Sequence, residues 1–249
     1  SSSNSYLKKF IENENKVKSK LIEIHNRPNY VNFIYKKNKN IILYFHNDPL
    51  KMKNSTSVSD RINLLKKTLV IIFNSNWTLN QFIKGIKKEH YKNKLEVIHQ
   101  STNKKKIKFK NKKKIIIFVG KLNKSKGYDI FCNAVVKILN KYPDWKAVAI
   151  GDEPRERIIF NHKRFKNLGF LDNSKVTSWF KKSDISVVCS RINEPFGRTA
   201  LEASSAGCAV IITNRGGLPE ASSSALKIRN LSIKNLQKNI EKLINNEGY

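Results

Sequence analysis

The sequence lacks the features that mark several large classes of protein. It has no run of about 18 apolar residues, so it predicts no membrane-spanning helix. The first ten residues, SSSNSYLKKF, are polar and lack the apolar core of a signal peptide. Cysteine is rare: Cys132, Cys189 and Cys208 form an odd set without the spacing of metal ligands. We interpret them as small core residues in a reducing compartment, and we therefore expect a cytoplasmic protein.

Acidic residues are also scarce, because 19 Asp and Glu stand against 49 Lys and Arg, giving a formal net charge of +30. Such an excess favours nucleic acid, an anionic membrane face or a phosphorylated ligand as partner. The cations are mostly Lys and accompany abundant Asn and Ile, and all three are encoded by AT-rich codons. Composition bias therefore ranks above nucleic-acid binding as the explanation. A basic surface still raises the local concentration of an anionic substrate.

The sequence does contain a strong strand and helix rhythm, in a chain of 249 residues that can bury a substantial core. Short apolar runs recur, as LIEIH, NIILYFH, TLVIIF and KLEVIH in the first half and KIIIFVG, WKAVAIG, DISVVCS and CAVIIT in the second. Helical spacing appears in YDIFCNAVVKILNKY, in SKVTSWFKK and from about Ile233 to Ile244. Continuously apolar strands alternating with helices predict an α/β fold with parallel sheets covered on both faces.

The stretch STNKKKIKFKNKKK, residues 101–114, interrupts this rhythm because it is highly charged. It fits a solvated loop within one domain or a linker between two. Since the rhythm restarts after it, we favour the linker. The predicted organisation is a partial N-terminal domain at 1–103, a basic linker at 104–114 and a C-terminal domain at 115–249.

Unusual residues follow the predicted strands, at the sheet edge where parallel sheets bind ligands. In GKLNKSKG, residues 120–127, Gly120, Lys121 and Lys126 stand before a helix expected to begin near Tyr128. Together with free N–H groups of that helix they would hold a diphosphate. The segment is not a P-loop, because Gly-Lys-Ser/Thr does not open the helix. Taken alone, it is better explained as an ordinary turn in a lysine-rich protein.

The segment EPFGRTALEASSAG places Glu194 in a Pro-Phe-Gly turn and Glu202 inside a helix expected from Arg198 to Ala206. Small residues let that helix lie close to its sheet and draw Glu202 inward, where ligand hydroxyls would satisfy an otherwise costly carboxylate. The alternative is an Arg198–Glu202 ion pair at i,i+4, which explains Glu202 but neither Glu194 nor the turn.

Two histidines and a glycine pair complete the candidates. His25 and His46 each close an apolar strand, where an exposed imidazole would donate to a phosphate or sugar oxygen, and two such histidines favour a site. Gly216 and Gly217 would let backbone amides approach a ligand, although a glycine pair more often forms a plain turn.

In order along the chain, FVGKLNKSKG, AIGDEPR and LGFLDNSKVTSWFKKSDISVVCSRINEPFGRTALEASSAGCAVIITNRGGLPE closely resemble one half of a known enzyme family. It is the nucleotide-sugar-binding half of the retaining glycosyltransferases of family 4, also called glycosyl transferases group 1, which have the two-domain GT-B fold. EIHNRP, LYFHNDP and FNSNWTLNQF resemble later strands of the family's first domain. The resemblance implies two Rossmann-like domains, the first incomplete and the closing helices absent, and so a fragment of a longer protein.

The resemblance also implies roles for matching residues. Lys121, where the family usually has Arg, and Lys126 would hold the donor's diphosphate beside Gly120. Glu202 would bind the ribose hydroxyls, and Glu194 the hydroxyls of the donor sugar.

His46 matches a first-domain histidine that faces the transferred sugar, so we class His46 with Glu194 as catalytic. Phe170 and Leu171 would lie beside the nucleotide base. The phosphates would meet the amides of the helix start, around Phe196, Gly197 and Arg198.

The implied reaction is glycosyl transfer, with retention, from a UDP- or GDP-linked sugar to a saccharide or lipid-linked acceptor. It would serve cell-surface polysaccharide or lipopolysaccharide synthesis, with peripheral association at the anionic inner membrane face left open. The family generally needs no metal, and the sequence has no Asp-x-Asp motif or His/Cys cluster, so we expect neither metal nor cofactor. The alternatives are another GT-B enzyme, such as a sugar-nucleotide epimerase, and the least favoured, a basic nucleic-acid-binding protein.

Overall fold

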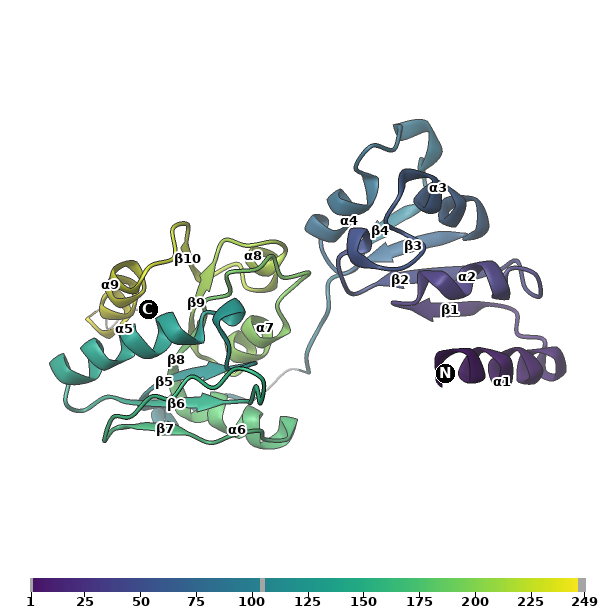
Figure 1. Ribbon diagram of the computed structural model, residues 1–249. Helices are drawn as coiled ribbons and strands as arrows, with labels where there is room; N and C mark the ends of the chain where they lie inside the picture. Colours follow the sequence, from purple (N-terminus) through teal and green to yellow (C-terminus); the bar gives the residue numbers. More distant parts are fainter. Residues whose placement is uncertain (1, 104–105, 246–249) are drawn as a thin grey trace. The chain divides into compact units, whose positions relative to one another are not determined.

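A computed structural model describes residues 2–103 and 106–245 and divides the chain into two compact units, residues 1–99 and 100–249 (Figure 1). Residues 104 and 105 of the predicted linker, and 246–249 of the predicted C-terminal domain, lie outside the described residues. Each unit contains its own parallel sheet and its own hydrophobic core, which agrees with the predicted α/β class.

In its described part, the first unit has a four-stranded parallel sheet in the order β1-β2-β3-β4. All four strands were predicted from their apolar runs. The strands are β1 (Ile22–His25), β2 (Ile41–Phe45), β3 (Val70–Phe73) and β4 (Leu95–Val97), and the helices are α1 (Ser2–Val17), α2 (Pro28–Ile34), α3 (Val58–Lys67) and α4 (Asn76–Ile83), with short 3₁₀ turns at Pro49–Lys51 and Lys88–His90.

Local sequence fixes where the helices of this unit begin. Ser57 starts α3 and Ser75 starts α4 with a capping box, in which the serine hydroxyl accepts from the amide three residues on. The core behind the sheet is aromatic: the rings of Phe45, Phe73 and Phe82 lie 5.2 to 5.7 Å apart between centroids.

The described part of the second unit has six parallel strands in the order β10-β9-β8-β5-β6-β7 (Figure 1). Helices α5 and α9 pack together over one face, and α6, α7 and α8 over the other. The strands are β5 (Lys113–Val119), β6 (Lys146–Ile150), β7 (Phe165–Asn167), β8 (Ser183–Val188), β9 (Ala209–Thr213) and β10 (Leu226–Ile228), and the helices are α5 (Tyr128–Lys141), α6 (Asn173–Lys182), α7 (Arg198–Ser205), α8 (Leu218–Ala221) and α9 (Ile233–Ile244), with 3₁₀ turns η3 (Phe109–Asn111) and η4 (Lys124–Lys126).

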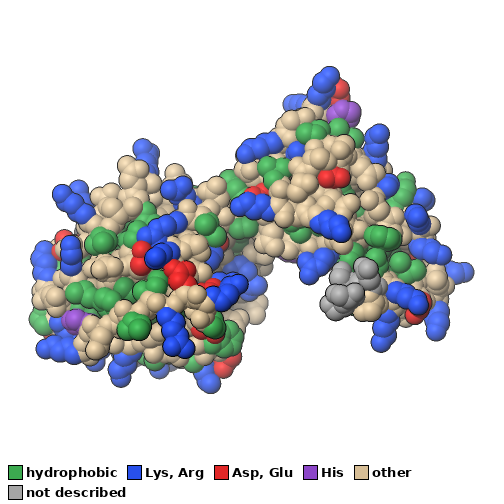
Figure 2. Space-filling view, in the orientation of Figure 1, with side chains coloured by type: hydrophobic (Ala, Val, Ile, Leu, Met, Phe, Trp, Pro, Cys, Tyr) green, Lys and Arg blue, Asp and Glu red, His purple; other side chains and the backbone are tan. Residues whose placement is uncertain are grey.

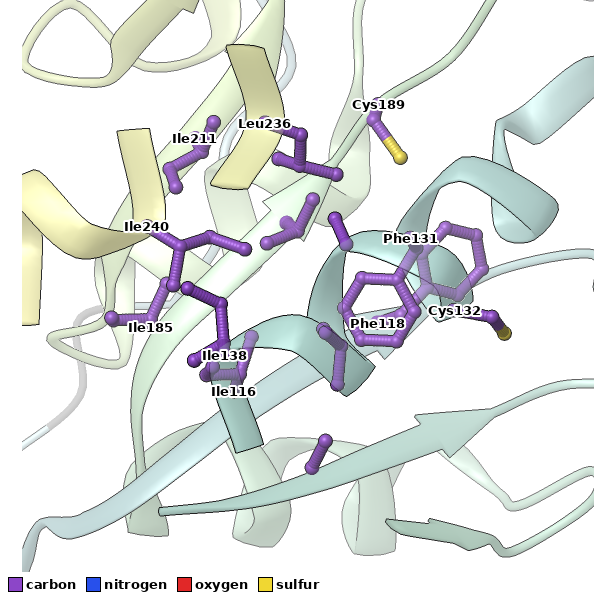
Figure 3. Packing of buried hydrophobic residues seen from close by; sticks show 14 of the residues in the cluster. Ile116, Phe118, Phe131, Cys132, Ile138, Ile185, Cys189, Ile211, Leu236 and Ile240 are labelled. Carbon is purple, nitrogen blue, oxygen red and sulfur yellow. The ribbon is translucent and has the colours of Figure 1, made fainter. Parts of the chain in front are cut away.

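Apolar side chains from both helices and from the strands interlock in the core under α5 and α9 (Figure 3). The predicted helix from Ile233 to Ile244 is confirmed with the same bounds, and it buries its apolar stripe there. Cys132 and Cys189 lie in this core, where burial raises the pKa of each thiol to about 12. All three cysteines are buried and unpaired by disulfides, as expected for core residues.

Part of the stretch predicted as a linker packs on the second unit. The Lys112 ammonium donates to the carbonyls of Phe180 and Ser183 at 3.0 and 2.7 Å, at the carboxyl end of α6. Burial lowers the pKa of Lys112. A cation is favoured at a helix carboxyl end, where carbonyls lack partners, so this lysine anchors the segment before β5. The high charge of this segment is what predicted a solvated linker from the sequence.

Candidate functional site

The carboxyl ends of β5 and β8 meet at the point where the strand order of the second sheet reverses, because β6 flanks β5 on one side and β8 on the other. Ligands of open parallel sheets bind at such a point. The loop 120–127 follows β5, and the loop 189–197 follows β8. The two loops are joined directly, since the Arg191 amide donates to the Ser125 carbonyl at 2.9 Å.

Glycine lets these loops approach each other. Gly127 has a φ of +76°, and a Cβ added to it would lie 2.0 Å from the Cys189 carbonyl oxygen at the end of β8. A Cβ on Gly151, after β6, would lie 1.9 Å from the Gly120 carbonyl oxygen. Both contacts involve rigid backbone, so the site edge is built too tightly for any side chain at these positions.

The structure brings together Lys126 and Glu194, two residues predicted for the site. The Lys126 Nζ lies 2.5 Å from Glu194 Oε1, and the two side chains are only 28% and 14% exposed. This half-buried lysine and carboxylate form a local dipole at the carboxyl ends of β5 and β8. Lys121 lies exposed directly after Gly120.

Glu194 is held by its backbone as well as its side chain. Its carbonyl accepts from the Gly217 amide at 2.7 Å, and it forms an isolated bridge with Gly216. The Gly216–Gly217 turn therefore supports the Glu194 loop, and the Gly217 amide donates its hydrogen bond to that loop.

At α7, the structure shows Glu202 both drawn inward and paired with Arg198. Its side chain is 18% exposed, as expected for a helix lying close to the sheet, and it accepts from Arg198 at 3.1 Å, as the ion-pair alternative predicted. The Arg198 side chain is 65% exposed. Phe196 is buried in the core, and Gly197 begins the helix without a capping side chain. First-turn amides at an uncapped helix start can bind an anion.

The residues predicted beside the base lie in different surroundings. Phe170 is 75% exposed, whereas Leu171 packs against the core under α6 and α7. A cavity of about 470 Å³ is lined among others by Leu122, Glu153 and Gly169, the residue directly before Phe170. It joins the loop after β5 to the segment after β6.

The first unit holds the two predicted histidines. The His25 Nδ1 and His46 Nε2 atoms lie 2.9 Å apart, and the imidazoles stack on each other and on Tyr44. The His25 Nε2 atom also lies 3.2 Å from Glu23 Oε1. The ends of the neighbouring strands β1 and β2 thus bring the two imidazoles into contact, and Glu23 and Tyr44 were not predicted.

Sequence analysis also missed the residues that support loop 120–127. Arg191 forms a bidentate pair with Asp129, at 2.6 and 2.7 Å. Asn123 caps η4 through its side-chain oxygen, and Glu153 accepts from the Asn123 amide group at 3.3 Å. Asp129 and Arg191 are 62 residues apart, so no local pattern in the sequence links them.

Within residues 2–103 and 106–245, no group of three or more His, Cys, Asp or Glu side chains could hold a metal ion. In the same ranges, no helix is both long and apolar enough to cross a membrane.

Residues 99–249, more than half of the chain, match the model of the family described as Glycosyl transferases group 1. Spore coat protein SA of Bacillus subtilis is 35% identical over 121 residues, covering 43% of this chain and 32% of that protein. The YtcC protein of the same organism is 28% identical over 235 residues, covering 79% of this chain and 56% of its own length. The chain thus spans about half the length, or less, of these curated relatives.

Two solved structures show the fold. A glycosyltransferase from Rickettsia africae superimposes with a TM-score of 0.75 at 19% identity, covering 97% of this chain and 71% of that one. Alr3699/HepE of Anabaena, in complex with UDP, gives a TM-score of 0.72 at 19% identity, covering 96% and 72%. The chain has two parallel-sheet α/β units like those of GT-B glycosyltransferases.

Proposed function

This chain belongs to the glycosyl transferases group 1 family, and from that premise we propose that it acts in transferring a sugar from a nucleoside-diphosphate sugar to an acceptor hydroxyl. We further propose retention at the anomeric carbon, as in glycosyltransferase family 4. The acceptor would be a saccharide or lipid-linked molecule in cell-surface polysaccharide synthesis.

The observation that carries this proposal is the Lys126–Glu194 pair at the switch point of the second sheet. A nucleoside-diphosphate sugar presents anionic phosphates next to neutral sugar hydroxyls. It needs a cation and a carboxylate side by side, because the ammonium attracts phosphate oxygens and the carboxylate accepts from hydroxyls. The structure holds such a cation and carboxylate together at one point, as an ion pair of 2.5 Å.

The remaining residues extend the donor site on both sides. Lys121 adds a second cation beside the diphosphate, and the first-turn amides of α7 at Gly197 and Arg198 add neutral donors. Glu202 would accept from the ribose hydroxyls in place of Arg198. We propose Phe170 and Leu171 for the base, next to the cavity at Gly169.

These donors would act on the leaving group. As the bond to the anomeric carbon breaks, negative charge grows on the diphosphate. Fixed cations and amides would stabilise this charge, and so would stabilise the transition state more than the ground state. The donor phosphate would assist deprotonation of the acceptor, and His46 of the first unit would face the transferred sugar. We propose that the reaction needs neither metal nor cofactor.

The test is a calorimetric titration of the chain with UDP, GDP and their common sugar conjugates. We expect binding of one nucleotide class, weakened at least about tenfold by Glu202→Ala, since a charged acceptor of two hydroxyls is lost. Glu241→Ala is the matched control, because Glu241 is also a paired helical carboxylate but contacts Lys141 at the far end of α5. Absence of binding by a folded chain would refute a working donor site.

Two further results would favour other functions. Conversion of the sugar nucleotide without transfer to an acceptor would indicate an epimerase. Steeply salt-dependent binding of DNA or RNA, unaffected by Glu202→Ala, would indicate nucleic-acid binding.

A further inference from the structure

The loop that carries Lys126 is fastened by a single arginine from the opposite side of the switch point. Both terminal nitrogens of Arg191 pair with the Asp129 carboxylate, at 2.6 and 2.7 Å, and Nη1 also donates to the Lys124 carbonyl. The Arg191 backbone amide donates to Ser125. Arg191, in the loop after β8, thus contacts both η4 and the first turn of α5, on either side of Lys126 in the chain.

The other flank of the same loop is held by carboxylates. Glu156 accepts from the Lys124 amide at 3.2 Å, and Glu153 accepts from the Asn123 side chain at 3.3 Å. Figure 2 shows acidic side chains gathered in one area of the second unit, on a face where Lys and Arg side chains are otherwise scattered. Acidic residues are scarce in this chain, and three of them, Asp129, Glu153 and Glu156, contact this loop or the residue that holds it.

We propose that Arg191 is a positioning residue for the donor site, which fixes the backbone of η4 so that Lys126 meets the diphosphate. This inference rests on the proposed function, but Arg191 itself is not assigned to the ligand. Its guanidinium is already engaged by Asp129 and Lys124, and its side chain is 36% exposed. Lysine has a flexible stem, so the charge at Lys126 is useful only where its backbone is held.

Geometry requires arginine at this position. The guanidinium satisfies two carboxylate oxygens and a carbonyl oxygen at once, through donors in a rigid planar fork. A lysine ammonium is a point donor and cannot reproduce the bidentate pair. The conservative substitution is therefore expected to fail at this site, which separates a role in geometry from a role in net charge.

The experiment compares Arg191→Met, Arg191→Lys and Asp129→Asn with the parent chain, and uses Lys141→Met as control. Lys141 forms a 3.0 Å ion pair at the opposite end of the same helix. We expect each of the first three variants to weaken binding of UDP or GDP about tenfold, as loss of a charged hydrogen bond would. Lys141→Met should bind as the parent does.

A double variant shows whether Arg191 acts through Lys126. In a Lys126→Met background, Arg191→Met should cause little further loss of nucleotide affinity, because the residue that it positions is gone. A purely structural role would instead add its full effect in both backgrounds.

A readout without ligand separates this inference from the proposed function. Amide hydrogen exchange at Lys126 and Gly127 should accelerate in Arg191→Met and stay unchanged in Lys141→Met. Unchanged exchange, or unchanged nucleotide affinity in Arg191→Met, would overturn the positioning role. If the parent chain binds no nucleotide, the proposed function fails, and exchange alone decides whether Arg191 orders the loop.

Discussion

Replacing Gly127 by alanine tests whether the close approach of α5 to the end of β8 is needed to build the proposed donor site. Gly127 lies between Lys126 and the first residue of α5, with a φ of +76°. The added methyl group would lie 2.0 Å from the carbonyl oxygen of Cys189 and 3.0 Å from its sulfur. Cys189 is buried in the core shown in Figure 3, so neither atom can move aside easily.

Gly169 provides the matched control for this substitution. Its φ is +66°, close to that of Gly127, but an added Cβ would meet no atom within 4 Å. Alanine at either position carries the left-handed backbone penalty of about 1 kcal/mol. Only Gly127→Ala adds overpacking against backbone, about 1 to 3 kcal/mol. We therefore expect a loss of about 1 kcal/mol for Gly169→Ala and about 2 to 4 kcal/mol for Gly127→Ala.

Native-state hydrogen exchange on peptides covering β5 and β8 measures these free energies in the intact chain, since it reports opening of the second unit alone. Nucleotide titration of Gly127→Ala measures the effect on the proposed donor site. Equal losses of stability in the two variants would show that α5 tolerates displacement from β8. The tight contact would then have no energetic importance.

Three other substitutions test individual polar groups. Ser186 Oγ is buried in β8 and, among the described residues, has no hydrogen-bond partner, so Ser186→Ala should raise the free energy of unfolding by about 1 kcal/mol. Ser183→Ala should lower the free energy of unfolding, because the buried Ser183 hydroxyl donates to the Trp179 carbonyl at 2.8 Å. Urea unfolding measures the free energy of both variants. Equal losses of stability would contradict the difference in hydrogen bonding between the two serines. Asp172 caps α6, and its hydrogen bonds with Ser174 and the Lys175 amide lower its pKa to about 2. A depressed folded-state pKa stabilises the fold above the ordinary value of 3.8 and loses that effect as pH falls towards 2, so Asp172→Asn should flatten the fall in melting temperature across that range. An unchanged slope would refute it.

In the second sheet, the interior strands were predicted from the sequence and the two edge strands were missed, and burial explains both outcomes. Interior strands such as β5 and β9 are buried on both faces, so they are continuously apolar and easily recognised. Among the described strands of the second sheet, β7 and β10 form the two edges, and each is only three residues long. A segment such as Phe165–Asn167, with two exposed residues, carries too little apolar pattern to be identified.

The candidate site divides in a similar way. Gly120, Lys126, Glu194 and Glu202 were predicted as candidates because each lies in a short motif whose order along the chain is specific. Their partners were not, since a hydrogen bond between Arg191 and Asp129 depends on the crossing of two loops 62 residues apart. Single-sequence patterns report what lies near in the chain, whereas the support of a site comes from what lies near in space.

The contact between Lys126 and Glu194 explains how two opposite charges are kept half-buried at the candidate site. A carboxylate that is 14% exposed is costly without a partner, and the ammonium of Lys126 supplies one in the absence of a donor. In the proposed function, sugar hydroxyls would donate to Glu194 in place of Lys126, and Lys126 would then direct its three N–H groups to phosphate oxygens. Through this exchange of partners, the Glu194 carboxylate and the Lys126 ammonium would each keep a hydrogen-bond partner, with or without a bound donor. The pair therefore lowers the penalty of keeping both charges ready at a half-buried site, provided that the backbone holding Lys126 stays fixed, which is the role inferred for Arg191.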